Sequence, residues 1–373
     1  MRKTPSYAGA QEQDLPTPCL LLDLDTLKTN IRTLQAFVAK HGKRLRAHAK
    51  THKCSRLAAL QIEEGAMGIC AAKVSEAQGL IASGIRDVLL TGPAVTPLAH
   101  EGILECARAD KGFIATIDNL ENATRLSELL VSQGRLLQCL LDLDVGFGRS
   151  GVPLENFMSF AAAARRLPGL KILGVQAYAG DVQHIADYEH RREANQKCLD
   201  AASSALRILR DSGFPDPILS VGGTGSHVFD CGHSDVTEIQ AGSYALMDVQ
   251  YRSIGSHENA ERFDTFAPSL SLLTTVVSTH RKGFVTVDAG LKAVYRDGAI
   301  PEVIEPGLHY DWFGDEYGKV SGNLANPPLR LGDKLHLVVS HCDPTVNLFD
   351  QFFIMQSKKV VDVWPIDLRG CSW

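Results

Sequence analysis

The sequence feature that most constrains the fold is a regular alternation of short β-rich runs with longer helical stretches between residues 44 and 246. Eight such runs can be distinguished, at residues 45–49, 68–72, 87–91, 113–118, 136–145, 171–178, 218–221 and 238–241. The stretches between them carry apolar residues three and four apart, as amphipathic helices do. Eight strands alternating with helices predict an α/β fold, a TIM (β/α)8 barrel, although a doubly wound open sheet has the same local pattern.

The pattern changes after residue 248, where strands follow one another without intervening helices. The expected strands are residues 269–278, 283–288, 334–340, 352–356 and 359–363. The apolar run within 17–25 precedes the barrel and could pair with them. We therefore predict a barrel domain at 26–247 and a second, C-terminal all-β domain made of 1–25 and 248–373.

Composition and charge narrow the range of partners. The 373 residues carry 38 basic and 43 acidic side chains, a formal charge of -5 without long runs, so neither nucleic acid nor an anionic membrane surface is an expected ligand. The N-terminus lacks the apolar core of a signal peptide, and no apolar run approaches the length of a membrane span. We expect a cytoplasmic protein that acts on small molecules.

The first predicted barrel strand ends in a basic run, Arg46-Ala-His-Ala-Lys-Thr-His-Lys53. If the chain stays extended, alternation places His48, Lys50 and His52 on one side and leaves Lys53 exposed. A lysine held inside a barrel mouth loses hydration, which lowers its pKa and suits a Schiff-base amine. The alternative is a solvated basic turn, because most lysines are exposed.

The fifth and sixth predicted strands also end in polar side chains. Arg149 lies in a glycine-rich loop and could serve as a fixed cation for a ligand, or as the ion-pair partner of Asp142 or Asp144. The sixth strand leads to Tyr178, an aromatic wall, and to His184, which could be catalytic or an ordinary loop histidine.

Two Gly/Ser/Thr-rich turns follow the seventh and eighth strands, Val221-Gly-Gly-Thr-Gly-Ser226 and Gln240-Ala-Gly-Ser-Tyr244. Barrels use turns in these two positions to hold a phosphate with backbone N–H groups and hydroxyls. Together they predict a phosphate site.

In the predicted β-domain, Ser340-His-Cys-Asp-Pro-Thr345 places His341 and Asp343 two residues apart. On an extended strand they would share one face, with Cys342 on the other. An imidazole and a carboxylate that leave the remaining positions to water and substrate suit a labile divalent ion, Mn²⁺ first and Mg²⁺ or Co²⁺ as alternatives. A purely structural His-x-Asp pair is the other interpretation.

Five segments in this order resemble the D-threonine aldolase and D-serine dehydratase-like family, which belongs to the alanine-racemase-like, fold-type III pyridoxal-phosphate enzymes. The segments are Arg46-Ala-His-Ala-Lys-Thr-His-Lys-Cys54, Val221-Gly-Gly-Thr-Gly-Ser226, Gln240-Ala-Gly-Ser-Tyr-Ala-Leu-Met-Asp248, Val287-Asp-Ala-Gly-Leu-Lys292 and Ser340-His-Cys-Asp-Pro-Thr345. The resemblance runs from about Thr17 to the C-terminus. Ala47 departs from it, where a proline is usual, and so does Tyr317, where a histidine is usual.

The resemblance implies pyridoxal 5'-phosphate as cofactor, with Lys50 forming the Schiff base. It assigns the phosphate to Thr224, Gly225, Gly242 and Ser243. It places Arg149 near the phenolic oxygen, Tyr178 beside the ring, and Gln240 where racemases have an arginine facing the pyridine nitrogen. A neutral glutamine there is expected not to protonate the ring fully, which makes the cofactor a restrained electron sink.

The implied activity is cleavage of D-threonine and other β-hydroxy D-amino acids to glycine and an aldehyde. A metal on His341 and Asp343 would lower the pKa of the substrate hydroxyl, and His184 would serve as the base. The resemblance also implies a homodimer with a shared active site. Two alternatives to the aldolase activity remain. One is a D-serine or D-3-hydroxyaspartate dehydratase, which tends to carry His-x-Cys at the metal. The other is a non-catalytic pyridoxal-phosphate carrier, which lacks the β-domain.

Overall fold

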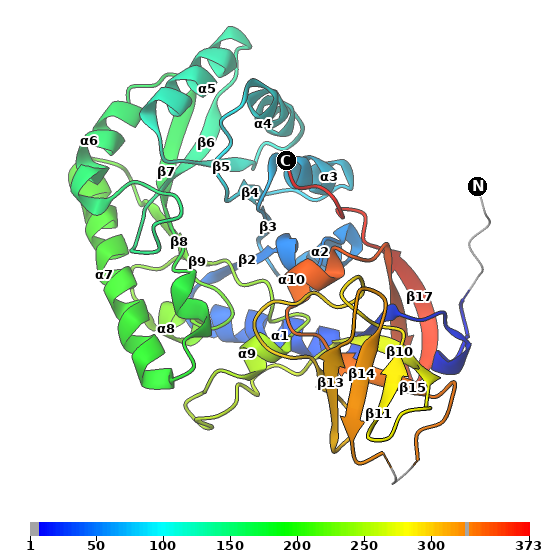
Figure 1. The fold of residues 1–373 in the computed structure, drawn as a ribbon. Helices are drawn as coiled ribbons and strands as arrows, with labels where there is room; N and C mark the ends of the chain where they lie inside the picture. The colour runs from blue at the N-terminus through cyan, green and yellow to red at the C-terminus, as the bar shows by residue number, and fades with distance from the viewer. Residues whose placement is uncertain (1–6, 325–327) are drawn as a thin grey trace.

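The computed structural model describes residues 7–324 and 328–373, and a closed barrel of parallel strands forms its larger part (Figure 1). The barrel strands are β2 (Arg44–His48), β3 (Gly68–Ala71), β4 (Val88–Leu90), β5 (Ile114–Ile117), β6 (Leu137–Asp142), β7 (Leu170–Ala177), β8 (Ile218–Val221) and β9 (Glu238–Ile239). They are buried along most of their length, because helices cover the outside and side chains fill the inside. The predicted TIM barrel is confirmed.

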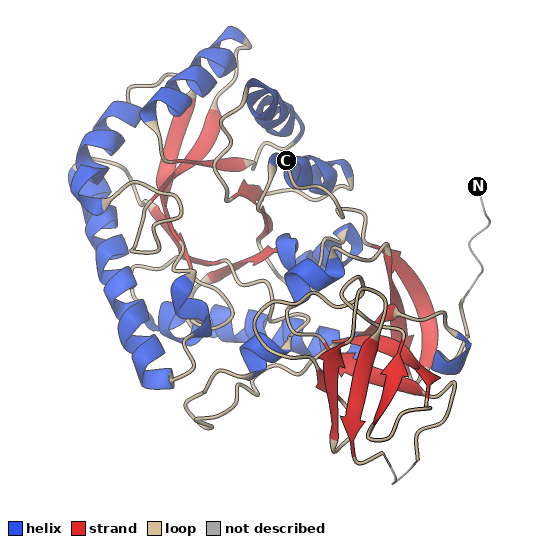
Figure 2. Ribbon diagram, viewed as in Figure 1, coloured by secondary structure: helices blue, strands red, loops and turns tan. Residues whose placement is uncertain are grey.

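Helices surround the barrel strands, as Figure 2 shows. They are α1 (Leu24–Lys40), α2 (Ser55–Glu63), α3 (Val74–Ala82), α4 (Pro97–Ala109), α5 (Leu120–Ser132), α6 (Leu154–Ala164), α7 (Tyr188–Asp211), α8 (His227–Gly232) and α9 (Val249–Arg252). The side chains of Thr96, Asn119 and Asp187 cap the first turns of α4, α5 and α7. Across the described ranges, a search for a helix with the length and apolar character of a membrane span gives no candidate.

The second part of the fold is a sheet beside the barrel (Figure 2). Its strands are β1 (Cys19–Asp23), β10 (Leu270–Ser278), β11 (Phe284–Val287), β12 (Glu302–Val303), β13 (Leu308–Trp312), β14 (Gly318–Gly322), β15 (Lys334–Val338), β16 (Gln351–Gln356) and β17 (Lys359–Pro365). β1 pairs with β10 and β16, which confirms that the run within 17–25 joins this sheet. Residues 1–6 of the predicted domain lie outside the described residues.

Three strands of this sheet, β12, β13 and β14, were not predicted. β12 has two residues, and β14, Gly-Lys-Val-Ser-Gly, begins and ends in glycine, so neither carries a strand signal of its own. β14 is held in place by its neighbours, because it pairs with β13 on one side and β11 on the other. β12 pairs with the distant strand β15 and β14 with the distant strand β11, whereas β13 pairs with the next strand, β14, so pairing in the folded sheet defines all three.

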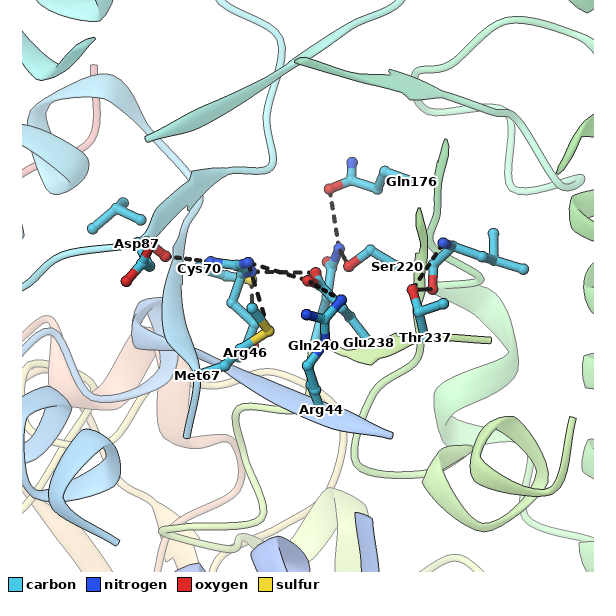
Figure 3. A network of polar contacts seen from close by, with 12 residues as sticks. Arg44, Arg46, Met67, Cys70, Asp87, Gln176, Ser220, Thr237, Glu238 and Gln240 are labelled. Carbon is cyan, nitrogen blue, oxygen red and sulfur yellow. Dashed lines mark hydrogen bonds and ion pairs between the residues drawn. The ribbon is translucent and has the colours of Figure 1, made fainter. Parts of the chain in front are cut away.

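The barrel closes where β9 pairs with β2, and a buried ion pair lies inside this junction (Figure 3). Arg46 Nη2 lies 3.1 Å from Glu238 Oε1, and Nε lies 3.3 Å from Oε2. Both side chains are almost fully removed from solvent. Arg46 also donates to the carbonyl oxygen of Asp87, the residue before β4. Its planar guanidinium, which comes from β2, therefore contacts both β9 and the start of β4.

Gly68 on β3 leaves the space that this arginine occupies. A Cβ atom at Gly68 would lie 2.5 Å from Arg46 Nη1 and 2.3 Å from the carbonyl oxygen of Asp87. Any side chain there would displace the guanidinium from the carbonyl that it binds.

We predict that Glu238→Gln lowers the free energy of unfolding by about 3 to 5 kcal/mol, because it leaves a buried guanidinium without its counter-charge. Arg46→Met combined with Glu238→Leu should recover most of that loss, since it removes both charges. Urea denaturation followed by circular dichroism measures both. Arg210→Gln, which breaks an exposed pair with Asp235, is the control. Equal effects of Glu238→Gln and Arg210→Gln would contradict the prediction.

Candidate active site

A pocket of about 350 Å³ lies at the C-terminal ends of the barrel strands. Four predicted site residues line it: Lys50 after β2, Arg149 after β6, Tyr178 after β7 and Gln240 after β9. They come from loops far apart in the sequence, and they meet because all parallel strands of the barrel end on the same face. His48, at the end of β2, lines the same pocket.

The local backbone after β2 decides which basic side chains reach the pocket. Strand β2 stops at His48, and the 3-10 helix η2 (Ala49–Thr51) follows. This turn breaks the predicted alternation. His52 is consequently fully buried away from the pocket, with its Nε2 3.3 Å from Gln61 Oε1, and the expectation that it shares a face with Lys50 is wrong.

Lys53 is buried, which corrects the prediction that it is exposed. Its Nζ donates to the carbonyl oxygen of Cys371 at 3.0 Å and lies 3.2 Å from Glu76 Oε1. Its positive φ of 51° turns the chain into α2, so the side chain points into the protein instead of outward. The two lysines of the motif therefore have different surroundings, and Lys50 is the one that lines the pocket.

Lys50 forms an ion pair with Asp343, at 3.0 Å between Nζ and Oδ1. The carboxylate raises the pKa of Lys50 above its ordinary value, since its attraction for the ammonium outweighs the effect of burial. The sequence-based expectation of a lowered lysine pKa is thus wrong. Burial disfavours the charged form of Asp343, but the charges of Lys50 and His341 outweigh it and hold the pKa of that carboxyl well below its usual range.

The short helix α10 (Cys342–Val346) carries Asp343, and His341 is its N-cap residue, so the predicted extended strand through the pair is wrong. The helix packs against η2 at the barrel mouth (Figure 1). His341 Nε2 lies 3.8 Å from Asp343 Oδ2, an oxygen that is shielded from solvent and accepts no hydrogen bond from the described residues. Cys342 points away, with Sγ 3.3 Å from the carbonyl oxygen of Met247.

His341 and Asp343 are a candidate pair of metal ligands, without a third ligand beside them among the described residues. Within residues 7–324 and 328–373, no group of three or more His, Cys, Asp or Glu side chains is arranged to hold a metal ion. Asp297, which sequence reasoning missed, contacts the other side of the imidazole, with Oδ2 3.0 Å from His341 Nδ1. It lies in a loop without a regular pattern, and only the folded chain shows that it reaches His341.

Arg149 is held over two aromatic rings, with its guanidinium carbon 5.1 Å from the centre of Phe147 and 5.3 Å from that of Tyr178. The two carboxylates considered as ion-pair partners have other contacts. Asp144 accepts hydrogen bonds from backbone N–H groups of its own loop, and Asp142 accepts from Ser150 and Gln176. Arg149 therefore offers a cation to the pocket that these groups do not neutralise.

The two predicted phosphate-binding turns provide free N–H groups. In the described part of the chain, the N–H groups of Thr224, Gly242 and Ser243 donate to no other group. The N–H of Gly225 differs, because it donates to Gln183 Oε1 at 3.0 Å. Gln183 is a second residue that sequence reasoning missed, although it lies one position before His184.

Gly242 allows the turn after β9 to pack closely on the end of β2. A Cβ atom there would lie 2.7 Å from Thr51 Oγ1 and 2.9 Å from the carbonyl oxygen of His48. Close packing therefore requires glycine at this position. It brings the second turn next to the segment that carries Lys50.

His184 lies in the 3-10 helix η3 (Asp181–His184), with its ring centre 4.4 Å from that of Tyr251. Burial, together with the charges of His341 and Lys50, lowers the pKa of His184 to about 4. The imidazole is therefore neutral near neutral pH, and its ring can accept a proton.

The fold and the arrangement of these residues define an alanine-racemase-like enzyme. The family model for the N-terminal domain of alanine racemase matches residues 22–249, and a model for a serine dehydratase domain matches residues 269–355. The chain belongs to the D-threonine aldolase family of alanine-racemase-like enzymes.

Three relatives are similar over nearly the whole chain. The chain is 38% identical to D-threonine aldolase of Arthrobacter sp., covering 99% of this chain and 96% of that one, and 35% identical to 3-hydroxy-D-aspartate aldolase of Paracoccus denitrificans, covering 98% and 95%. The crystal structure of D-threonine aldolase from Filomicrobium marinum superposes with a TM-score of 0.94 at 31% identity, covering 100% of both chains. Proteins named aldolases are carbon–carbon lyases.

We predict that Asp343→Asn lowers the pH at which Lys50 becomes reactive by about 1 to 3 units, because an opposite charge at this distance favours the ammonium form. In the wild-type chain the raised pKa keeps Lys50 protonated to higher pH, so its amine is acetylated only at higher pH than in Asp343→Asn. Competitive acetylation followed by mass spectrometry, without added cofactor, measures the midpoint. Asp350→Asn, at an exposed carboxylate, is the control. An unchanged midpoint in Asp343→Asn would show that the ion pair does not set the pKa.

Proposed function

We propose that the chain is a pyridoxal-phosphate- and divalent-metal-dependent aldolase that cleaves D-threonine and other β-hydroxy D-amino acids to glycine and an aldehyde. The observation that carries this proposal is the 3.0 Å contact between Lys50 and Asp343. It brings the lysine for the cofactor and the carboxylate for the metal into one site, although 292 residues separate them in the sequence. The relatives named aldolases support the same reaction class.

The residues around the pocket fit the cofactor. Lys50, which lines the pocket, is the amine for its aldehyde group. The donors for its phosphate are the free N–H groups of Thr224, Gly242 and Ser243, with the Thr224 hydroxyl, in the two turns after β8 and β9. Arg149 is a cation for the phenolic oxygen, and Tyr178 flanks the ring. Gly225 does not add a donor, because its N–H is bonded to Gln183, and a Cβ atom there would lie 2.1 Å from the carbonyl oxygen of Gln183.

The pair in α10 fits a divalent cation. Asp343 Oδ2 is a shielded oxygen with no hydrogen-bond partner in the described part of the chain, and a cation beside it would satisfy it. Asp297 would fix the orientation of His341, in the manner of carboxylates behind metal-binding imidazoles. Two protein ligands suit Mn²⁺, with Mg²⁺ or Co²⁺ as alternatives, because they leave positions for water and substrate.

When bound, pyridoxal phosphate supplies an electron sink for the Cα–Cβ bond, and the metal supplies a Lewis acid for the hydroxyl. The protein then has to orient the substrate and accept a proton. His184 can accept the proton of the β-hydroxyl on its imidazole, directly or through one water, because the ring is neutral near neutral pH. Arg149, which Asp142 and Asp144 do not neutralise, can attract anionic groups to the pocket.

A dehydratase acting on D-serine or D-3-hydroxyaspartate is the second candidate. The serine dehydratase domain match supports it, as does the D-threo-3-hydroxyaspartate dehydratase from Delftia sp. HT23, whose structure superposes with a TM-score of 0.86 at 25% identity, covering 95% of this chain and 98% of that one. Asp343 at the position where the dehydratases tend to have cysteine favours the aldolase.

We predict that incubation with D-threonine, pyridoxal phosphate and Mn²⁺ yields glycine and acetaldehyde, and that chelation abolishes turnover but leaves the visible absorbance of the bound cofactor. His341→Ala and Asp343→Ala should each lower turnover by at least about 100-fold, or about 2.7 kcal/mol, because either loss removes the cation from the hydroxyl. Product analysis and a stopped assay measure these effects.

Cys342→Ala is the matched control, because this side chain lies between the two ligands in sequence but faces Met247. It should keep most of the turnover and the same metal requirement. Formation of 2-oxobutanoate and ammonia would identify a dehydratase instead. Undiminished cleavage after thorough chelation would exclude the proposed role of the metal.

We further propose a homodimer with a shared active site. Four large apolar side chains of the second domain are exposed by 37 to 54%, namely Leu291, Tyr295, Phe313 and Tyr317. Leu291 and Phe313 belong to neighbouring segments, since Leu291 N–H donates to Gly314 O and Phe313 N–H to Tyr317 O. Tyr295 adjoins α10 through Thr345. Exposed apolar patches of this kind commonly form protein interfaces.

We expect sedimentation velocity at assay concentration to give a dimer. Phe313→Asp combined with Tyr317→Asp should shift the population toward monomer and reduce turnover, because a charge in an apolar interface loses its hydration. Leu331→Asp, at an exposed apolar residue elsewhere, is the control. A fully active monomer would overturn the proposal.

A further inference from the structure

Three buried polar side chains from adjacent barrel strands form a connected network beside the pocket (Figure 3). Gln240, after β9, donates from Nε2 to Gln176 Oε1 at 3.2 Å and to Ser220 Oγ at 2.9 Å. Gln176, at the end of β7, and Gln240 both line the pocket with Lys50. Both amides are nearly removed from bulk solvent, so each of their polar atoms should have a partner.

The orientation of each amide follows from a group whose polarity is fixed. The carbonyl oxygen of Thr91 can only accept a hydrogen bond, and it lies 3.0 Å from Gln176 Nε2. Asp142 Oδ1, at 2.9 Å, accepts from the same nitrogen. Gln176 must therefore direct its NH2 group toward these two acceptors and its oxygen toward Gln240.

The same reasoning determines the second amide. Gln176 Oε1 can only accept, so Gln240 must direct its NH2 group toward it. Ser220 can accept or donate, and it is compatible with either orientation. Both hydrogens of Gln240 Nε2 are then used inside the network. Its Oε1 makes no hydrogen bond with another described residue and remains for whatever occupies the pocket.

We infer that Thr91 and Gln176 fix Gln240 so that it presents a carbonyl oxygen to the pocket, and that the ring nitrogen of the bound cofactor is held there as N–H. This inference rests on the proposed function, because it assumes that pyridoxal phosphate is the occupant. A neutral pyridine nitrogen only accepts hydrogen bonds, so facing an acceptor oxygen it would leave two lone pairs in contact. The protonated nitrogen donates to that oxygen.

The other polar groups of the cofactor have different partners. The phosphate requires donors, which the two turns provide, and the phenolic oxygen requires a donor or a cation, which Arg149 provides. Gln240 Oε1 suits neither of them. Gln176 is then a positioning residue that acts through Gln240. The consequence differs from the sequence-based expectation, because a glutamine fixed as an acceptor favours protonation of the ring and strengthens the electron sink.

The test is the ¹⁵N NMR shift of the ring nitrogen, measured on the full-length protein loaded with ring-¹⁵N pyridoxal phosphate. The wild-type signal should lie at the position of a protonated pyridine nitrogen across neutral pH. Gln240→Leu removes the acceptor, and Gln176→Leu frees the Gln240 amide to rotate, so both should move the signal toward the neutral position. Ser220→Ala should leave it at the protonated position, since Ser220 does not set the polarity.

Gln240→Leu keeps Gln176 bonded to Thr91 and Asp142, so it remains informative if Gln176→Leu fails to fold. A neutral ring nitrogen in the wild-type protein overturns the inference, and so does a signal that Gln240→Leu does not move. In both cases the bound cofactor is still detected and the proposed function stands. If no labelled cofactor is retained, the proposed function fails and this inference fails with it.

Discussion

Closure of the barrel between β9 and β2 is the constraint on which the rest of the structure depends. The two strands share only two paired positions, Arg44 with Glu238 and Leu45 with Ile239. The bidentate contact between Arg46 and Glu238 adds a buried electrostatic link across the same junction. Without this closure the first and last strands would be the edges of an open sheet, and their ends would not meet.

The closure also assembles the pocket. Lys50 follows β2 and the turn containing Gly242 follows β9, so pairing of these two strands brings the lysine proposed for the Schiff base next to a turn proposed to bind the phosphate. Glycine at position 242 lets this turn pack against the end of β2, because the Cβ atom of any other residue would collide with the carbonyl oxygen of His48. The proposed positions of the amine and of the phosphate donors are thus linked through the backbone.

Charged and neutral side chains form separate polar contacts inside the barrel. One contact is the ion pair of Arg46 and Glu238, and the other is the neutral network of Gln176, Ser220 and Gln240 (Figure 3). Of these residues, Gln176 and Gln240 line the pocket. Neutral side chains have a fixed direction but no net charge, so they can set the polarity of a contact without attracting a counter-ion. At the mouth, Lys50 and Asp343 are opposite charges, and a cation on the carboxylate would compete with the ammonium.

The sequence alone predicted eight strands alternating with helices, because apolar runs and helical periodicity are local signals. Closure of these strands into a barrel instead of an open sheet came from the pairing of β9 with β2. The sequence also identified Lys50, Arg149, Tyr178 and Gln240, which the structure brings into one pocket. These four residues could be identified because each lies at the end of a predicted strand or in the loop after it, where a barrel places its functional side chains.

Only the tertiary structure decided how those residues contact one another. The turn of η2 buries His52, the fold buries Lys53 against Glu76, and α10 replaces the predicted strand through His341 and Asp343. Asp297 and Gln183 carry no motif, and the roles proposed for them follow from contacts with residues more than 40 positions away. The pKa of Lys50 depends on a carboxylate from the other end of the chain. Electrostatic and hydrogen-bonding partners depend on distances in space, which local sequence periodicity does not encode.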